Sequence, residues 1–432
     1  QATSTAWRAG RLTSDEAVAA YRESVAIALA AGDRETAARA MRRLYYQLGL
    51  QGETAAARTT LDQAIELLET AGEPGLTLAE LYACRSESEM FAGRSQESLD
   101  WAERALQLPR TEAVTLMGLH LRGNARCELG DLDGIADLHH ALDVARGSGN
   151  ALDMVTSYSY LCEWIGLLEG PKAALAMNRE AIDLCNGRGL SGQESWARAE
   201  GMWLLFDLGE WDEIVATAPP LQRWADEHGD VQVGTVARSF RARVLAHRGR
   251  TDEAAEALTE ALPAARQIED LQVLGPVLLA AAITAGVDGD QAEAIARLQE
   301  FDAITEGGPT EYRELQLPEA VRVAIGAGQV DLAERLVGDR PVHAPRTQMS
   351  VDMSRAMVSE ARGAFDDALI AFRSSAAAWS RWSVPLEHGH ALMGAARCLR
   401  ALDRSEEADA VEAEGKVLLE ALGVPEVTAP RT

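Results

Sequence analysis

Apolar residues recur along this chain at intervals of three and four, the spacing of one face of an α-helix. In GRTDEAAEALTEAL, residues 249–262, Ala254, Leu258 and Leu262 share one face, and Thr251 stands where an N-cap is expected. Similar faces occur within residues 98–105, 174–181 and 368–376. No stretch alternates β-branched and polar residues between hairpin turns. The pattern predicts an all-α protein.

Glycines separate the predicted helices at regular intervals. Glycine after a helix adopts the left-handed conformation with little strain, and a following Asp, Ser, Thr or Glu favours the start of the next helix. The predicted corners are Gly10, Gly49, Gly93, Gly130, Gly170, Gly209, Gly249, Gly286, Gly328, Gly363 and Asp403. Their mean spacing of about 39 residues is typical of two-helix repeats. We therefore predict a right-handed superhelical α-solenoid of about eleven helical hairpins.

One segment interrupts this regular spacing. Between Gly328 and Thr347 a short second helix is followed by GDRPVHAP, in which Pro341 and Pro345 oppose regular helix. We expect one repeat array over residues 1–337, an irregular loop or hinge at 338–346, and further repeats over 347–432. A plain long loop is the alternative interpretation of the interruption.

Several segments share one arrangement of helix ends. In AIALAAGDRETAARAMRRLYYQLG, residues 26–49, one helix ends at Gly-Asp and the next at Leu-Gly; ALDVARGSGNALDMVTSYSYLCEWIGLLEG and LPAARQIEDLQVLGPVLLAAAITAG repeat it. These segments resemble the tetratricopeptide repeat, in the longer form of bacterial signalling proteins. The resemblance covers nearly the whole chain. It implies the C-terminal repeat region of a large bacterial ATP-binding LuxR-type regulator or of a repeat-bearing nucleotide cyclase.

Composition and charge narrow the possible partners. The 432 residues include 41 Lys and Arg against 67 Asp and Glu, a net charge of −26, which argues against nucleic acid as a partner of this segment. The longest uncharged apolar stretch, 273–287, is shorter than the ~20 residues that span a bilayer, and we expect a buried helix and no membrane contact. The five cysteines lack CxxC spacing, so we expect buried thiols and a cytoplasmic location.

No catalytic, cofactor or metal motif emerges. Lys172 and Lys416 are the only lysines, and neither lies in a phosphate-binding GxxxxGK[ST] loop. The acidic turns at 131–134 and 288–290 lack the ligand register of a calcium loop. His388 and His390, two apart on a helix, point in different directions. We predict a noncatalytic protein without a cofactor or metal.

The repeat also predicts where a ligand would bind. One face of each first helix would line a concave groove with aromatic and Arg residues, which are common anchors in binding sites. The predicted groove residues are Arg39, Arg43, Tyr46, Glu87, His120, Asn124, Tyr160, Trp164, Trp196, Trp203 and Arg243, with Glu80 and Ser239 beside them. The alternative is core packing, because Trp196 and Trp203 are seven residues apart, on one helix face.

Three functions follow from these features. The first is a protein–protein interaction or ligand-sensing module of a larger cytoplasmic bacterial signalling or transcription regulator. It would bind a peptide, a partner protein or a small hydrophobic ligand in the groove. The second is a small-molecule or enzymatic pocket inside the superhelix, with Glu87, His120 or Arg243 as its polar groups. The third is a self-association scaffold that forms a homo-oligomer.

Overall fold

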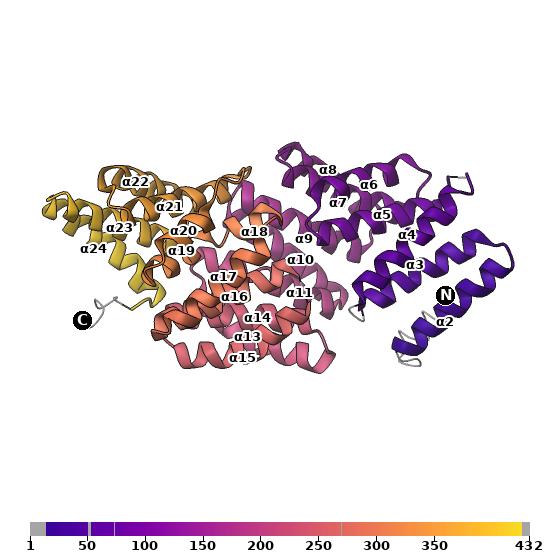
Figure 1. The fold of residues 1–432 in the computed structure, drawn as a ribbon, viewed down its shortest axis with the longest axis horizontal. Coiled ribbons are helices and arrows are strands. Elements are labelled where there is room, and N and C mark those ends of the chain that lie inside the picture. Colours follow the sequence, from indigo (N-terminus) through magenta and orange to yellow (C-terminus); the bar gives the residue numbers. More distant parts are fainter. Residues whose placement is uncertain (1–13, 51–52, 73, 269, 426–432) are drawn as a thin grey trace. The chain divides into compact units, whose positions relative to one another are not determined.

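The computed structural model describes residues 14–50, 53–72, 74–268 and 270–425. These residues form helices, turns and loops without a strand, and consecutive helices pack in pairs, which confirms the predicted all-α solenoid (Figure 1). The chain divides into two compact units, residues 1–148 (unit 1) and 149–432 (unit 2).

In unit 1 each described helix packs against the next along the chain. The helices are α2 (Ser14–Ala30), α3 (Arg34–Leu50), α4 (Thr54–Glu69), α5 (Leu76–Phe91), α6 (Ser95–Gln107), α7 (Glu112–Glu128), the short 3₁₀ helix η1 (Leu132–Gly134) and α8 (Ile135–Ser148). Small residues allow close packing: a Cβ on Gly118 of α7 would lie 2.8 Å from the Leu106 side chain of α6.

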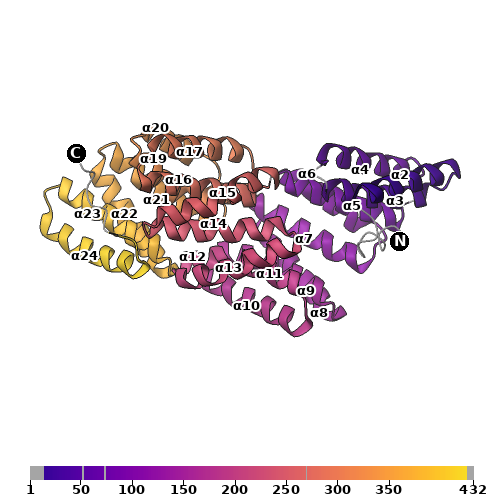
Figure 2. The ribbon, with the colours of Figure 1, turned by 90° about the horizontal axis from the view of Figure 1, so that it is seen from below.

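Unit 2 continues the pattern and also brings distant helices together. Its helices are α9 (Ala151–Leu168), α10 (Pro171–Arg188), α11 (Ser191–Glu200), α12 (Met202–Leu208), α13 (Trp211–His228), α14 (Val231–His247), α15 (Thr251–Ile268), α16 (Leu271–Asp288), α17 (Gln291–Thr305), α18 (Thr310–Glu314), α19 (Leu317–Gly326), α20 (Val330–Val337), α21 (Pro345–Ala361), α22 (Phe365–Trp382), α23 (Pro385–Ala401) and α24 (Ser405–Leu422). Helix α16 packs against both α14 and α19, which are the first helices of the preceding and following repeats (Figure 2). In addition, α21 contacts α9, and α23 contacts α12.

Most predicted corners coincide with left-handed backbone. Gly93, Gly249 and Gly363 have φ of 69°, 72° and 82°, and Asp403 reaches 58°. Side chains cap several of the helices that follow other turns; for example, the Asp230 carboxylate accepts from the Val233 amide at 3.1 Å. Gly10 lies outside the described residues.

At three positions the structure differs from the corners and the loop that the sequence predicts. Gly49 lies in the last turn of α3, and Gly286 lies inside α16, which ends at Gly289 with φ of 90°. The two glycines near the end of α16 are three residues apart, so spacing alone does not distinguish them. The irregular loop spans 338–344, because Pro345 occupies the first turn of α21, where its missing N–H costs no helical hydrogen bond. The role of this loop as a hinge stays a prediction.

Two first helices are each divided into two shorter helices. At Gly201, between α11 and α12, the Asn178 side chain of α10 donates to the Ala197 carbonyl at 2.8 Å, and a Cβ on Gly201 would lie 2.6 Å from the Asn178 Oδ1. The helical backbone bonds persist there, because the Gly201 amide donates to the Ala197 carbonyl at 3.0 Å and the Leu205 amide donates to the Gly201 carbonyl at 3.1 Å. Between α18 and α19, the Gln316 side chain donates to the Tyr312 carbonyl of its own segment at 2.7 Å. Gly201 directly follows Glu200, which belongs to the candidate site described below.

The apolar segment in α16 belongs to the core of unit 2. By length and composition α16 could cross a membrane, but Val277, Leu278 and Leu279 are fully buried against neighbouring helices. They join an apolar cluster that extends from Ala242 to Ala408. The predicted buried helix is confirmed.

Candidate ligand-binding site

In unit 1, two predicted groove residues lie near each other on neighbouring helices. The Tyr46 hydroxyl of α3 lies 3.1 Å from the Cys84 Sγ of α5, and Tyr46 is 37% exposed. Glu87, one turn further along α5, is half-buried, and burial raises the pKa of its carboxyl to about 7. Arg39 is exposed and Arg43 half-buried on α3.

The α7 residues of the predicted groove lie in the protein interior. His120 and Asn124 are 4% and 3% exposed. Burial lowers the pKa of His120 to about 4, so its ring is neutral at pH 7. The Asn124 amide donates to the Glu128 carboxylate at 2.8 Å. These positions differ from the prediction of an open groove, because α7 is covered by neighbouring helices on more than one side.

In unit 2 the predicted aromatic residues separate into two groups. Trp164 is 2% exposed and belongs to the core. Trp203 packs against α9, where a Cβ on Gly166 would overlap its ring. Tyr160 and Trp196 are half-buried and remain partly accessible. Core packing, the alternative interpretation, therefore describes Trp164 and Trp203, which contribute to stability.

Arg243, predicted to contact a ligand, is buried in an internal ion pair. Its guanidinium bonds the Glu319 carboxylate of α19, and its Cζ lies 4.0 Å from the centre of the Phe206 ring. His247 Nε2 lies 2.5 Å from the same carboxylate. Burial, followed by the Arg243 and Arg322 charges, lowers the pKa of His247 well below its usual value, so a neutral ring meets Glu319. The Glu319 carboxylate neutralises Arg243 locally.

Two further ion pairs connect distant helices of unit 2. Arg346 of α21 bonds Asp207 of α12 through two hydrogen bonds of 2.9 and 3.1 Å. Arg322 of α19 holds Glu387 of α23 at 2.7 and 2.6 Å. Both pairs are largely buried, and each is locally neutral. They join parts of the unit that a simple stack of repeats would leave apart.

Unit 2 also contains a second group of acidic side chains. We call Glu163, Glu200, Asp270 and Glu311 the acidic cluster; they come from α9, α11, the N-cap of α16 and α18. Burial, followed by the negative charges of Glu311 and Glu200, raises the pKa of Glu163 to about 8. The Tyr312 hydroxyl donates to Glu163 and lowers its pKa, an effect smaller than that of burial and the two carboxylates.

Polar and aromatic side chains orient the carboxylates of this cluster. The Ser159 hydroxyl donates to Glu200 at 2.7 Å, and the Trp196 indole donates to the same carboxylate. Burial raises the pKa of Glu200 to about 7 despite these bonds. The Gln272 amide donates to the Tyr312 hydroxyl at 2.7 Å, which fixes the donor to Glu163. The result is a group of acidic side chains beside aromatic rings, in which Glu163, Glu200 and Asp270 are half-buried and Glu311 is buried.

This arrangement suits an organic cation. A bound ammonium or guanidinium group would favour the ionised forms of Glu163 and Glu200, whose pKa values burial raises, and aromatic faces add cation–π attraction. Within the described ranges, no three His, Cys, Asp or Glu side chains gather closely enough to hold a metal ion. The acidic cluster therefore has the chemistry of a binding surface for a cationic side chain.

Sequence reasoning missed the carboxylates although a local signal was present. Glu163 follows Tyr160 by three residues and Glu200 follows Trp196 by four, the spacings that place two side chains on one helix face. Asp270 and Glu311 carry no such signal, because they come from elements far along the chain from Glu163 and Glu200.

Comparisons with known proteins identify the fold. No protein-family model and no curated protein sequence matches the chain. The structure of Rap protein complexed with competence and sporulation factor aligns with a TM-score of 0.57 and 12% identity, over 80% of this chain and 98% of that one. The APC/C hetero-tetramer Cut9-Hcn1 aligns with a TM-score of 0.51 and 13% identity, over 92% and 86%.

The fold of this chain is therefore that of tetratricopeptide-like helical-repeat proteins, as the sequence predicted. The human IFIT1 dimer with m7Gppp-AAAA aligns less well, with a TM-score of 0.43 and 15% identity over 88% of this chain and 90% of that one. The expectation that this segment binds no nucleic acid stays a prediction that rests on its charge.

Proposed function

We propose that this chain is a noncatalytic helical-repeat module that binds a peptide or partner protein at the acidic cluster. The observation that carries the proposal is the acidic cluster beside Tyr160 and Trp196, in which burial and the negative charges of Glu311 and Glu200 raise the pKa of Glu163. A Lys or Arg side chain of the partner would neutralise these carboxylates. The repeat fold, which presents extended surfaces for recognition, supports the same function.

The proposal extends to the larger protein. The resemblance to bacterial regulators favours a cytoplasmic chain in which the repeats sense a partner and an attached module carries the output, as in LuxR-type regulators or nucleotide cyclases. In this proposal the repeats need no cofactor and catalyse no reaction.

The test is a selection from a random peptide library on the immobilised full chain. We expect the selected peptides to carry Arg or Lys. Replacing that residue with norleucine should weaken binding at least about tenfold, which corresponds to about 1.4 kcal/mol. The double variant Glu163→Gln, Glu200→Gln should lose a similar amount.

The matched control is Glu169→Gln, which removes an exposed carboxylate at the end of α9. It should bind the selected peptides as the unaltered chain does. The proposal is wrong if no peptide is selected, or if the selected peptides lack a cation and bind the double variant with unchanged affinity.

A further inference from the structure

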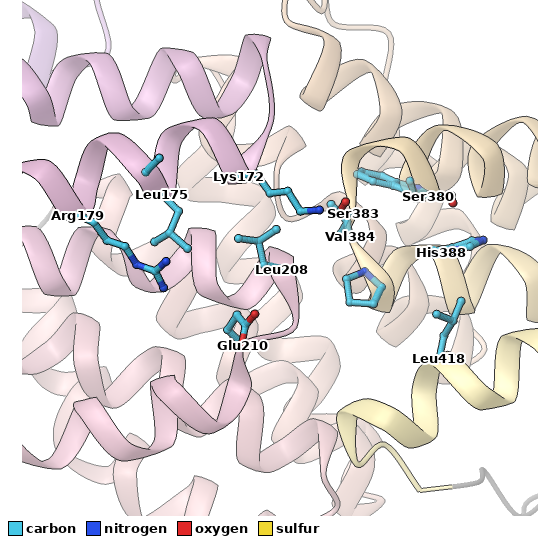
Figure 3. Close-up of a pocket in the computed structure, with 13 residues that line it drawn as sticks. Lys172, Leu175, Arg179, Leu208, Glu210, Ser380, Ser383, Val384, His388 and Leu418 are labelled. Atoms are coloured by element: carbon cyan, nitrogen blue, oxygen red, sulfur yellow. The ribbon is translucent and has the colours of Figure 1, made fainter.

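Unit 2 contains a cavity of ≈ 590 Å³ that the proposed function does not use. Its walls come from α10, the end of α12, the corner between α22 and α23, and α24 (Figure 3). These elements belong to the two ends of unit 2 in sequence. The volume lies within the range of about 300–1,000 Å³ found for small-molecule sites.

One charged group of this cavity favours an anion. Lys172 extends from α10 toward Ser383 (Figure 3) and forms no ion pair with any carboxylate in the part of the chain that the structure describes. Arg179 is the second cation of the lining, and Glu213 offsets its charge at 3.6 Å. Glu210 is the carboxylate of the lining. Lys172 is therefore the cation that an added anion would pair with.

Three helix N-termini also border the cavity. Lys172 lies in the first turn of α10, Glu210 is the N-cap of α13, and Pro385 begins α23. None of these three N-termini has a side-chain cap. Each helix has 17 or 18 residues, so its dipole places partial positive charge at this end. The helix ends support the charge of Lys172.

The remainder of the lining is apolar. Leu175, Leu208, Val384, Pro385 and Leu418 surround the polar groups. Burial lowers the pKa of His388, so its imidazole lines the wall as a neutral ring near pH 7. An inorganic anion would leave this apolar surface in contact with water. An anion that carries an apolar body would cover it.

We propose that this cavity binds a small organic carboxylate with an apolar body, whose carboxylate is held by Lys172. The carboxylate lies toward α10, and the apolar body packs between Leu208 and Leu418. Such a ligand contacts both ends of unit 2 and stabilises their association. The site is separate from the acidic cluster, so failure of one proposal leaves the other standing.

The test uses 4-phenylbutyrate as the probe on the full chain, with calorimetry and saturation-transfer NMR. The neutral control is 4-phenylbutan-1-ol and the cationic control is 4-phenylbutylamine. We expect saturable binding of the acid, at least about fivefold weaker binding of the alcohol, and no binding of the amine. Lys172→Gln should weaken the acid about three- to tenfold, because a charge-assisted bond is lost.

Two further variants distinguish a bound site from general charge effects. Ala176 lines the cavity and is exposed, so Ala176→Phe should fill the space and abolish binding while circular dichroism stays unchanged. Lys416→Gln removes the only other lysine, on α24, and should bind as the unaltered chain does. The proposal is overturned if the acid shows no saturable binding, if the amine binds as tightly as the acid, or if Lys172→Gln and Ala176→Phe leave binding unchanged.

Discussion

Removing one member of the buried pair Arg346–Asp207 should destabilise unit 2 far more than removing an exposed pair. Arg346 is 3% exposed and also donates to the Ser350 hydroxyl at 2.6 Å, and its Cζ lies 4.6 Å from the centre of the Trp379 ring. The substitution Arg346→Met keeps much of the apolar stem and removes the charge. It leaves the buried Asp207 carboxylate without its guanidinium partner.

The expected magnitude follows from two estimates. Two unit charges about 4 Å apart, at an effective dielectric constant of about 20, attract each other by about 4 kcal/mol. Experiments on buried pairs find that loss of one partner costs about 3–5 kcal/mol, because the other charge stays buried without compensation. We expect Arg346→Met to lower the free energy of opening of α12 and α21 by this amount.

A double-mutant cycle tests the reasoning. Asp207→Leu alone should cost a similar amount, whereas the double variant should cost much less than the sum, because no buried charge is left unpaired. Hydrogen exchange of α12 and α21 measures the local free energies, since a chain with two units need not unfold in one step. The control Arg362→Met breaks an exposed bidentate pair with Glu334, of 2.7 and 2.8 Å, and should cost under about 1 kcal/mol. If Arg346→Met costs no more than this control, or if the two single effects add, the buried pair does not hold these helices together.

Three other predictions concern stability and reactivity. The pKa of Glu163 rises from an ordinary 4.5 to about 8 in the fold, so the folded state binds more protons and the free energy of unfolding falls as pH rises from about 4.5 to about 8. Urea titrations at several pH values should show this fall, and Glu163→Gln should reduce it. All five cysteines are buried, and burial raises the thiol pKa of each. A disulfide reagent at pH 8 should therefore modify them slowly in the native protein and quickly in denaturant, and fast modification of all five in the native state would contradict this prediction. Gly394→Ala would place a Cβ 2.5–2.7 Å from the Phe372 ring and should lower the free energy of unfolding by about 1–3 kcal/mol, measured by thermal or urea denaturation. Gly326→Ala, whose Cβ would have no atom within 4 Å, should be neutral or slightly stabilising, and equal effects of the two substitutions would contradict the packing argument.

The sequence predicted those features that depend on local conformation. The corners at Gly93 and Gly249 follow from the backbone that a glycine permits at a helix end, and the apolar spacing of α15 follows from its own periodicity. The contact at Gly201 was not predictable in this way, because the Asn178 side chain that packs against it comes from another helix.

The candidate site shows the same limit of local reasoning. Spacing along a helix identifies a face but not what covers it, so Tyr160 and Trp164 looked alike in the sequence. The structure leaves Tyr160 half-buried and places Trp164 in the core. The burial of Arg243 depends on Glu319, 76 residues away, and no pattern within one repeat indicates that partner.

The 139-residue separation of Arg346 and Asp207 has a consequence for how this array can evolve or be engineered. Solenoids usually gain or lose single hairpins easily, because each hairpin contacts only its neighbours. In unit 2, deleting or inserting one hairpin between α13 and α20 would move α21 out of register with α12 and separate both charges from their partners. The number of hairpins between α12 and α21 is therefore fixed, and viable variants in length should occur in unit 1 or at the chain ends.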